Sequence, residues 1–247
     1  MAEAMIWDPI ERLLWGIAIS LLILCGIIYF RKWRQNENFK DKILFYGFTF
    51  LFICLAISSF FEYLSDFFII GRFKNFAFYG DYDKVDPQYN LFYKLSEIVF
   101  EIPFIILFLA FEVNIKRTKG IITMIQIIFV SILIILPVAS IMFYTVVAIA
   151  FIYSSTIILF VFFFFTRASK LEFKAIGAFL ILSSILFGAA EILSFWQIKE
   201  LNVIPLIIPP LLYIIGAIFG LFSWLVIPND FRAFCVIGIS FLFLTFF

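Results

Sequence analysis

Two of the most apolar stretches of the sequence each carry a pair of carboxyl side chains four residues apart. Glu62 and Asp66 stand in FFEYLSDFF, and Glu97 and Glu101 stand in KLSEIVFEIPF. Residues four apart lie on one face of an α-helix, so each stretch presents a two-carboxyl stripe. If the stripes face each other, repulsion between like charges keeps part of the cluster protonated. Such a site suits a proton, a hard cation such as Ca²⁺ or Na⁺, or an organic cation held against aromatic rings.

Position along the helix distinguishes Glu101 from the other acids. It stands eleven residues before Glu112, which is about 16 Å along a helix and close to the middle of a bilayer. An acid at that depth is costly, so it faces a protein interior or a water-filled cavity. A neutral glutamic acid bonded to a carbonyl released by Pro103 would satisfy the same constraint without a ligand. Glu62, Asp66 and Glu112 could instead be solvated residues at the membrane interface.

A further acid, Glu191 in GAAEILSF, lies in the outer half of another apolar run, and tyrosines stand near these carboxyls. We therefore predict a ligand site without a specified metal, formed by Glu97, Glu101, Glu191, Glu62, Asp66 and Tyr213.

Composition identifies the class of protein. Of the 247 residues, 65% are hydrophobic and 14% are charged, against roughly 25% charged residues in soluble domains. A bilayer core needs about 20 apolar residues per helix. The sequence predicts an all-α polytopic membrane protein, a single transmembrane domain (1–247) that forms a bundle of seven transmembrane helices. The predicted spans are 11–30, 43–65, 92–113, 119–138, 141–165, 175–196 and 205–227.

Two segments lie outside these spans. Residues 71–91 form a polar outer loop, and the short apolar C-terminal tail, 231–247, is either an interfacial helix or a truncated span. Most of the 18 Lys and Arg residues follow the first, third and fifth spans or lie in the tail. By the positive-inside rule, the N-terminus is outside the cell membrane and the C-terminus is cytoplasmic.

Several functional classes are disfavoured by what the sequence lacks. With 0 His, histidine-ligated zinc or haem and Ser-His-Asp chemistry are excluded. The 3 Cys residues show no Cys-x-x-Cys spacing, and there is no activated nucleophile or phosphate loop. We expect no cofactor and no enzymatic activity, although paired carboxyls can perform acid and base catalysis. The net charge of +1 gives no reason to expect nucleic acid, so the lipid bilayer is the main partner.

The last predicted span combines helix breakers with small residues. Pro205, Pro209 and Pro210 interrupt it, and Gly216 and Gly220 form the small-xxx-small spacing of close helix pairs. A kink with a packing contact explains both features. The alternative is a broken helix at a binding site.

Seven spans with an outside N-terminus invite comparison with known membrane families. The last span, IPLIIPPLLYIIGAIFGLFSWLV, has no lysine for the retinal of microbial rhodopsins, and the zinc hydrolases of the progestin-receptor and alkaline-ceramidase type need histidines. The stretch LEFKAIGAFLILSSILFGAAEIL and a final span ending in LVIPNDFRAF resemble uncharacterised archaeal seven-transmembrane sensor-like integral membrane proteins. The resemblance covers the last third of the chain. The resemblance implies a seven-transmembrane architecture and a sensory or ligand-binding role. It assigns no residue a function.

The leading hypothesis is a seven-helix binding or sensory module. Its outward-facing acidic pocket, formed by the second, third, sixth and seventh spans, would take a cation, a proton or a cationic ligand, and would signal to a membrane or cytoplasmic partner. One alternative is a cation- or proton-coupled transporter or channel. That alternative needs a polar path to the cytoplasmic face, whereas the third span reads FIILFLAF beyond Glu101. A further alternative is a non-catalytic subunit of a larger membrane complex.

Overall fold

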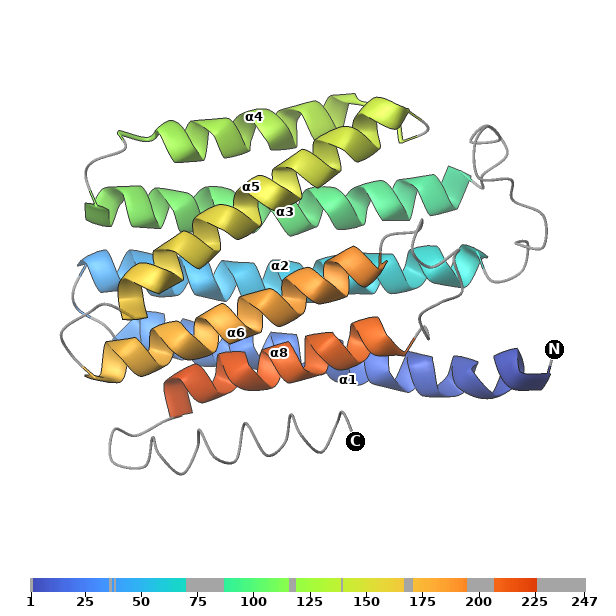
Figure 1. Cartoon of the computed structure of the whole chain (residues 1–247), viewed down its shortest axis with the longest axis horizontal. Helices are drawn as coiled ribbons and strands as arrows, with labels where there is room; N and C mark the ends of the chain where they lie inside the picture. The colour runs from blue at the N-terminus through green and yellow to red at the C-terminus, as the bar shows by residue number, and fades with distance from the viewer. Residues whose placement is uncertain are drawn as a thin grey trace. The chain divides into compact units, whose positions relative to one another are not determined.

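Helices are the only regular secondary structure in the described part of the chain. The computed structural model describes residues 2–35, 37, 39–69, 87–115, 119–138, 140–166, 171–194 and 207–225. These residues form seven α-helices and no strand (Figure 1), which confirms the all-α prediction for them. The helices are α1 (Ala2–Gln35), α2 (Phe39–Ile69), α3 (Pro87–Ile115), α4 (Ile121–Ile135), α5 (Ile141–Thr166), α6 (Leu171–Ser194) and α8 (Ile208–Leu225). Each predicted apolar run overlaps one of these helices.

Three helices are long and apolar enough to cross a membrane. The qualifying segments are Ile10–Gln35 in α1, Lys42–Leu64 in α2 and Ile141–Val161 in α5. Shorter apolar helices occupy Ile121–Ile135, Gly177–Leu193 and Ile208–Phe222. The α3 helix is 29 residues long but carries four ionisable side chains between residues 94 and 112. The described helices are therefore compatible with a membrane protein, and the seven-span bundle with its orientation stays a prediction.

The α4 helix is shorter than the predicted span 119–138. Its 15 residues cover about 22 Å, less than the roughly 30 Å of a bilayer core. It begins after Lys119 and Gly120, whose φ angles of 51° and 85° are left-handed. It ends because Leu136 is extended, as expected of a residue that precedes a proline. Counting apolar residues overlooked these breaks.

Prolines also set the starts of two other helices. The α8 helix begins at Ile208, so Pro209 and Pro210 lie in its first turn, where proline is tolerated, and do not interrupt it. The α3 helix begins at Pro87, so the last residues of the predicted loop 71–91 are helical. Residues 71–86, Pro205 and the tail 231–247 lie outside the described residues.

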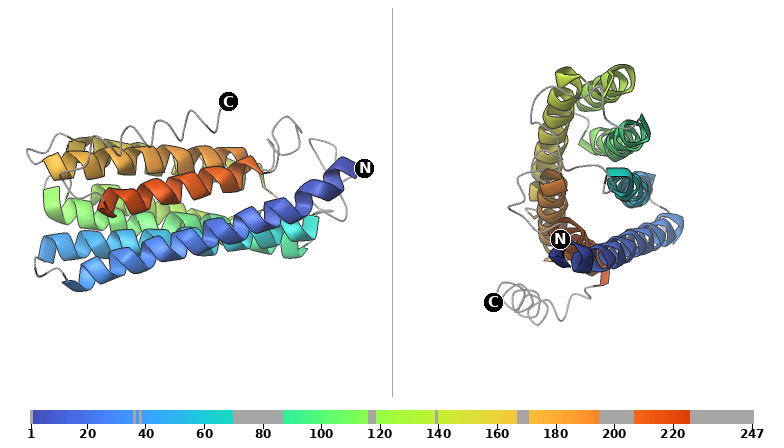
Figure 2. Two further views of the ribbon diagram at one scale, coloured as in Figure 1. Left: turned by 90° about the horizontal axis from the view of Figure 1, so that it is seen from below. Right: turned by 90° about the vertical axis from the view of Figure 1, so that its right-hand side faces the viewer.

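The chain divides into two compact units, residues 1–156 and 157–247, with α5 crossing the boundary. In the first unit, α1, α2, α3 and α4 lie side by side in chain order (Figures 1 and 2). The α2 and α3 helices are antiparallel, since Gly47 lies against Leu107 and Ser58 bonds Ser96. A Cβ at Gly47 would be 3.4 Å from the Cα of Leu107. The two backbones therefore approach closely here.

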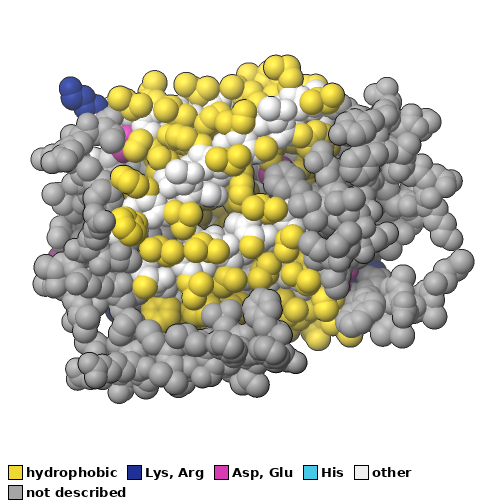
Figure 3. Space-filling model, viewed as in Figure 1, with side chains coloured by type: hydrophobic (Ala, Val, Ile, Leu, Met, Phe, Trp, Pro, Cys, Tyr) yellow, Lys and Arg dark blue, Asp and Glu magenta, His cyan; other side chains and the backbone are white. Residues whose placement is uncertain are grey.

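The outer surfaces of α4 and α5 in the first unit are apolar. Ile135 is 79% exposed and Met142 is 67% exposed, and hydrophobic side chains cover this part of the surface (Figure 3). Exposed Met124 and Ile152 belong to the same surface. Large exposed apolar areas mark surfaces that contact lipid or another protein. These helices therefore have the exterior expected of a membrane protein.

In the second unit, α6 and α8 form an antiparallel pair. The Ser183 hydroxyl donates to the Gly216 carbonyl at 2.8 Å. The Phe187 ring lies against Gly216, where a Cβ would be 2.7 Å from Cε1 of that ring. One turn further on, the rings of Phe179 and Phe219 stack with centroids 6.0 Å apart. The small residue at position 216 thus permits the close helix contact that the GAIFG spacing predicts.

Candidate functional site

Glu101 meets side chains from two other helices of the first unit. Its Oε2 accepts a hydrogen bond from Gln126 Nε2 of α4 at 2.6 Å and one from the Ser154 hydroxyl of α5 at 2.8 Å. Gln126 Nε2 also donates to the backbone carbonyl of Glu101 at 3.2 Å. All three side chains are buried, with at most 1% of each exposed. We call Glu101, Gln126 and Ser154 the Glu101 cluster.

Helical periodicity explains why these residues meet. The buried residues of α4 are Thr123, Gln126, Val130 and Leu133, a spacing of three and four residues that defines one helix face. Gln126 therefore points to the same side as the apolar residues that pack inside the unit. On α5, Ser154 follows Ala150 at the same spacing, and both are fully buried. These small side chains leave room for the glutamine and the carboxyl group.

Two other predicted acids lie near Glu101. Glu97 interacts electrostatically with Glu62 of α2 and with Glu101, and its carboxyl lies beside the Tyr93 hydroxyl. Glu62 is 6% exposed, whereas Glu97 is half-buried. Glu97 thus interacts with one acid of α2 and with one acid of its own helix, and the facing of the two predicted stripes stays a prediction. We call Glu62, Glu97 and Glu101 the carboxyl face.

Three small polar side chains, Ser58, Ser59 and Ser96, lie within one helical turn of Glu62 or Glu97. The hydroxyls of Ser58 and Ser96 lie 3.0 Å apart, and each also donates to the other residue's backbone carbonyl. Ser59 is 1% exposed, and its hydroxyl has no hydrogen-bond partner among the described residues. The side chain of Asp66 lies outside the described residues, so its predicted place in the site stays a prediction.

Glu112 holds the N-terminus of α4, contrary to the interpretation of this residue as solvated at an interface. It is only 6% exposed. Its Oε1 accepts from the Ile122 amide at 2.9 Å, and its Oε2 accepts from the Thr123 amide and hydroxyl at 3.2 and 2.5 Å. Gly120, at the N-cap position, has no side chain to do this. A carboxylate at the positive end of a helix is favourable.

The opposite end of α4 is held by a residue of the same neighbour, α3. Lys94 Nζ donates to the carbonyls of Ile134 and Leu136 at 2.7 and 2.9 Å. A cation at the C-terminus of a helix complements the helix dipole. A lysine and a glutamate of α3 therefore fix the two ends of α4, and the Glu101 cluster bonds its middle.

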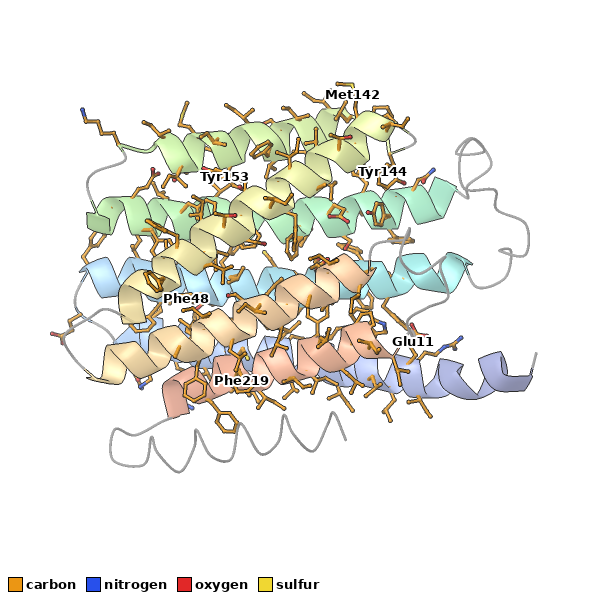
Figure 4. All side chains as sticks on the ribbon, in the orientation of Figure 1. Glu11, Phe48, Met142, Tyr144, Tyr153 and Phe219 are labelled. Carbon is orange, nitrogen blue, oxygen red and sulfur yellow. The ribbon has the colours of Figure 1, made fainter. Side chains whose placement is uncertain are left out.

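Further buried polar groups lie between Glu101 and Glu112. The sequence of the third predicted span did not indicate them. Thr123 lies one turn from Gln126 on α4 and bonds Glu112. The Tyr153 hydroxyl of α5 donates to the Ile122 carbonyl at 3.0 Å (Figure 4). Because these groups come from α4 and α5, the apolar run FIILFLAF in α3 gave no sign of them. The one available signal was the lone glutamine of IITMIQIIFV.

Another buried acid escaped the sequence prediction. Glu11 of α1, labelled in Figure 4, is 9% exposed and is the first residue of the first predicted span, where we named no candidate. In the second unit, the Tyr213 hydroxyl donates to Oε1 of Glu191. These two predicted site residues therefore contact each other, from α8 and α6. Their place in one pocket with the carboxyl face stays a prediction.

The fold and the site define a class rather than a family. The chain is all-α in its described part, has three helices apolar enough to cross a membrane, and buries hydrogen-bonded carboxyls between helices. Within the described residues, no group of three or more His, Cys, Asp or Glu side chains is placed to hold a metal ion. No protein-family model, curated protein or solved structure matches this chain.

Proposed function

We propose that this chain is an integral membrane binding or sensory module whose ligand site is the carboxyl face of α2 and α3. The observation that carries the proposal is the arrangement of Glu97. This half-buried carboxyl interacts electrostatically with two buried ones, Glu62 and Glu101. A group that is accessible and adjacent to buried acids can take up a positive charge and relieve their repulsion.

The chemistry of the carboxyl face selects the class of ligand. Its groups are carboxyls and hydroxyls, which favour a proton, a small hard cation or an organic cation. The buried Ser59 hydroxyl is unpartnered among the described residues, and such groups usually have a partner such as a bound water or ion. Tyr93, beside Glu97, supplies an aromatic ring of the kind that organic cations contact. The metal stays unspecified in this proposal.

The output would pass through the Glu101 cluster. A charge taken up at Glu97 changes the electrostatic environment of Glu101, which bonds Gln126 and Ser154 on two other helices. The hydrogen bonds of α4 and α5 to α3 therefore depend on the ligand. Helix movement would then reach a signalling partner in the membrane or on its cytoplasmic side, with the N-terminus outside.

A second candidate is a proton- or cation-coupled transporter. The observation that favours it is the set of buried polar residues between Glu101 and Glu112, namely Gln126, Ser154 and Thr123. Transport needs polar groups across the whole membrane. Gln126 and Ser154 already bond Glu101, and Thr123 bonds Glu112, which favours a structural role for them, so the binding module ranks first. A non-catalytic subunit of a larger complex is third, and purification as a stable single chain would count against it.

The test is thermal unfolding of the full chain in detergent, from acidic to alkaline pH, with and without Ca²⁺, Mg²⁺ and Na⁺. A ligand that binds only the folded state raises the unfolding temperature. We expect a pH- or cation-dependent shift in the wild type that is smaller in Glu97→Gln. The matched control is Glu37→Gln, at an exposed position between α1 and α2, which should keep the shift. A wild type that responds to neither pH nor any of these cations would refute the proposal.

A further inference from the structure

The hydrogens available in the Glu101 cluster are too few for an ionised Glu101. The Ser154 hydroxyl has one hydrogen but lies within reach of two acceptors, Glu101 Oε2 at 2.8 Å and Gln126 Oε1 at 3.2 Å. The amide hydrogens of Gln126 are directed to the carboxyl and to the backbone carbonyl of Glu101. If Ser154 donates to an ionised Glu101, Gln126 Oε1 has no other donor in the described part of the chain. A buried acceptor without a donor is unfavourable.

An ionised Glu101 is equally unfavourable if the Ser154 hydroxyl donates to Gln126 instead. If Ser154 donates to Gln126, a lone pair of its oxygen faces the carboxylate oxygen, with both groups fully buried. One additional hydrogen on Glu101 Oε2 removes both conflicts. Glu101 then donates to Ser154, Ser154 donates to Gln126 Oε1, and Gln126 Nε2 donates back to Glu101. Each of the three bonds in this closed ring then has one donor and one acceptor.

We propose that Glu101 is a proton-binding site, and that its proton closes a hydrogen-bonded ring which locks α3, α4 and the first-unit part of α5 together. This inference rests on the proposed function and specifies its ligand as a proton. Loss of the proton leaves one acceptor unpaired or two oxygens in repulsion, so the contact of the three helices weakens. The ring therefore converts proton occupancy into helix packing.

The charged groups around Glu101 are compatible with this role. On its own helix the nearest is Glu97, one turn away, and beyond it lies Glu62 of α2. Two residues of α4 and α5 bond Glu101, namely Gln126 and Ser154, and both are uncharged. Among the described residues no cationic side chain bonds Glu101, so a proton is the charge that compensates it. Glu97 is half-buried and is the residue that we expect to pass the proton.

The test is infrared spectroscopy of the full chain in lipid bilayers at neutral pH, with and without ¹³C-carboxyl glutamate. A protonated carboxyl gives a carbonyl band separate from carboxylate bands, and the label shifts it. We expect such a band in the wild type and in Glu37→Gln, and its loss in Glu101→Gln. In Ser154→Ala the band should persist at higher frequency, because the proton has lost its acceptor.

The result that overturns the ring is a wild type without a label-sensitive acid band, or a band unchanged in Glu101→Gln. Unfolding provides a second measurement, because the ring predicts that stability falls as alkaline pH removes the proton. That fall should be absent in Glu101→Gln. The two proposals fail separately. A chain that binds a cation but has no acid band keeps the proposed function and loses the ring. An acid band and a pH-dependent stability that both depend on Glu101, with no response to cations and no change in Glu97→Gln, keep the ring and lose the carboxyl face as the ligand site.

Discussion

The strongest structural prediction concerns Glu112 and the N-terminus of α4. In Glu112→Gln the side chain keeps its shape, but one carboxylate oxygen becomes an amide group that cannot accept. Three donors point at the present carboxylate, namely the Ile122 amide and the amide and hydroxyl of Thr123. At least one of them loses its acceptor in a site where Glu112 is 6% exposed. The change therefore leaves a buried donor unpaired next to a helix end.

The expected cost combines two effects. An unpaired buried donor costs about 1–3 kcal/mol, and loss of a negative charge at a helix N-terminus costs about 0.3–2 kcal/mol. We expect Glu112→Gln to lower the free energy of unfolding by about 2–4 kcal/mol, since the two terms overlap and do not simply add. The assay is reversible unfolding of the full chain in detergent micelles. Hydrogen exchange of the Ile122 and Thr123 amides gives a local measurement, and their protection should fall.

The control is Glu37→Gln, which makes the same chemical change at an exposed position and should alter stability by no more than about 0.5 kcal/mol. Thr123→Val removes only the hydroxyl contact and should cost about 1 kcal/mol. If Glu112→Gln and Glu37→Gln unfold at the same midpoint with unchanged exchange of the α4 amides, the reasoning about this helix end is wrong.

Three further predictions test other parts of the structure. Lys94→Met removes two hydrogen bonds to the C-terminus of α4 and should cost about 1–2 kcal/mol in the unfolding assay; an unchanged midpoint would contradict it. Gly216→Ala places a Cβ 2.7 Å from the Phe187 ring and should destabilise by about 1–3 kcal/mol. Gly16→Ala, with nothing within 4 Å, should be neutral or stabilising, and equal effects of the two substitutions would refute the packing argument. In proteoliposomes with a pH-sensitive dye, we expect no proton flux above that of empty liposomes; flux that Glu101→Gln abolishes would favour the transporter.

The helices were predictable because their signal is local. A run of apolar residues long enough for a bilayer is also a run without turn formers, so each predicted span overlaps a helix. The ends were less predictable. Pro137 ends α4 early, and the left-handed residues Lys119 and Gly120 delay its start, whereas a count of apolar residues ignores backbone conformation. Such a count locates a helix better than it locates its caps.

The candidate site was predictable only in part, because hydrogen-bond partners are a property of pairs of helices. Spacing showed that Glu97 and Glu101 share a face, and burial showed why Glu101 needs partners. Nothing in one sequence specifies that Gln126 and Ser154 are those partners, since this depends on which faces of α4 and α5 turn inward. Glu112 was misjudged for the same reason: its position near the end of a predicted span suggested solvent, but the end of another helix covers it.

Glu101 and Glu112 show how the same residue type on one helix acquires two different roles. Both oxygens of Glu112 accept from donors of α4, so an ionised carboxylate is satisfied there without a proton. At Glu101, the one hydrogen of the Ser154 hydroxyl lies between two acceptors, Glu101 Oε2 and Gln126 Oε1. The proposed ring therefore needs a proton on Glu101 to close. Loss of that proton would leave α4 anchored at both ends, by Lys94 and by Glu112. The expected response is therefore a shift of the middle of α4 relative to α3, and not detachment of the helix. Hydrogen exchange at alkaline pH should then rise around Gln126 before it rises in the first turn of α4, and exchange that rises first at that turn would contradict this order.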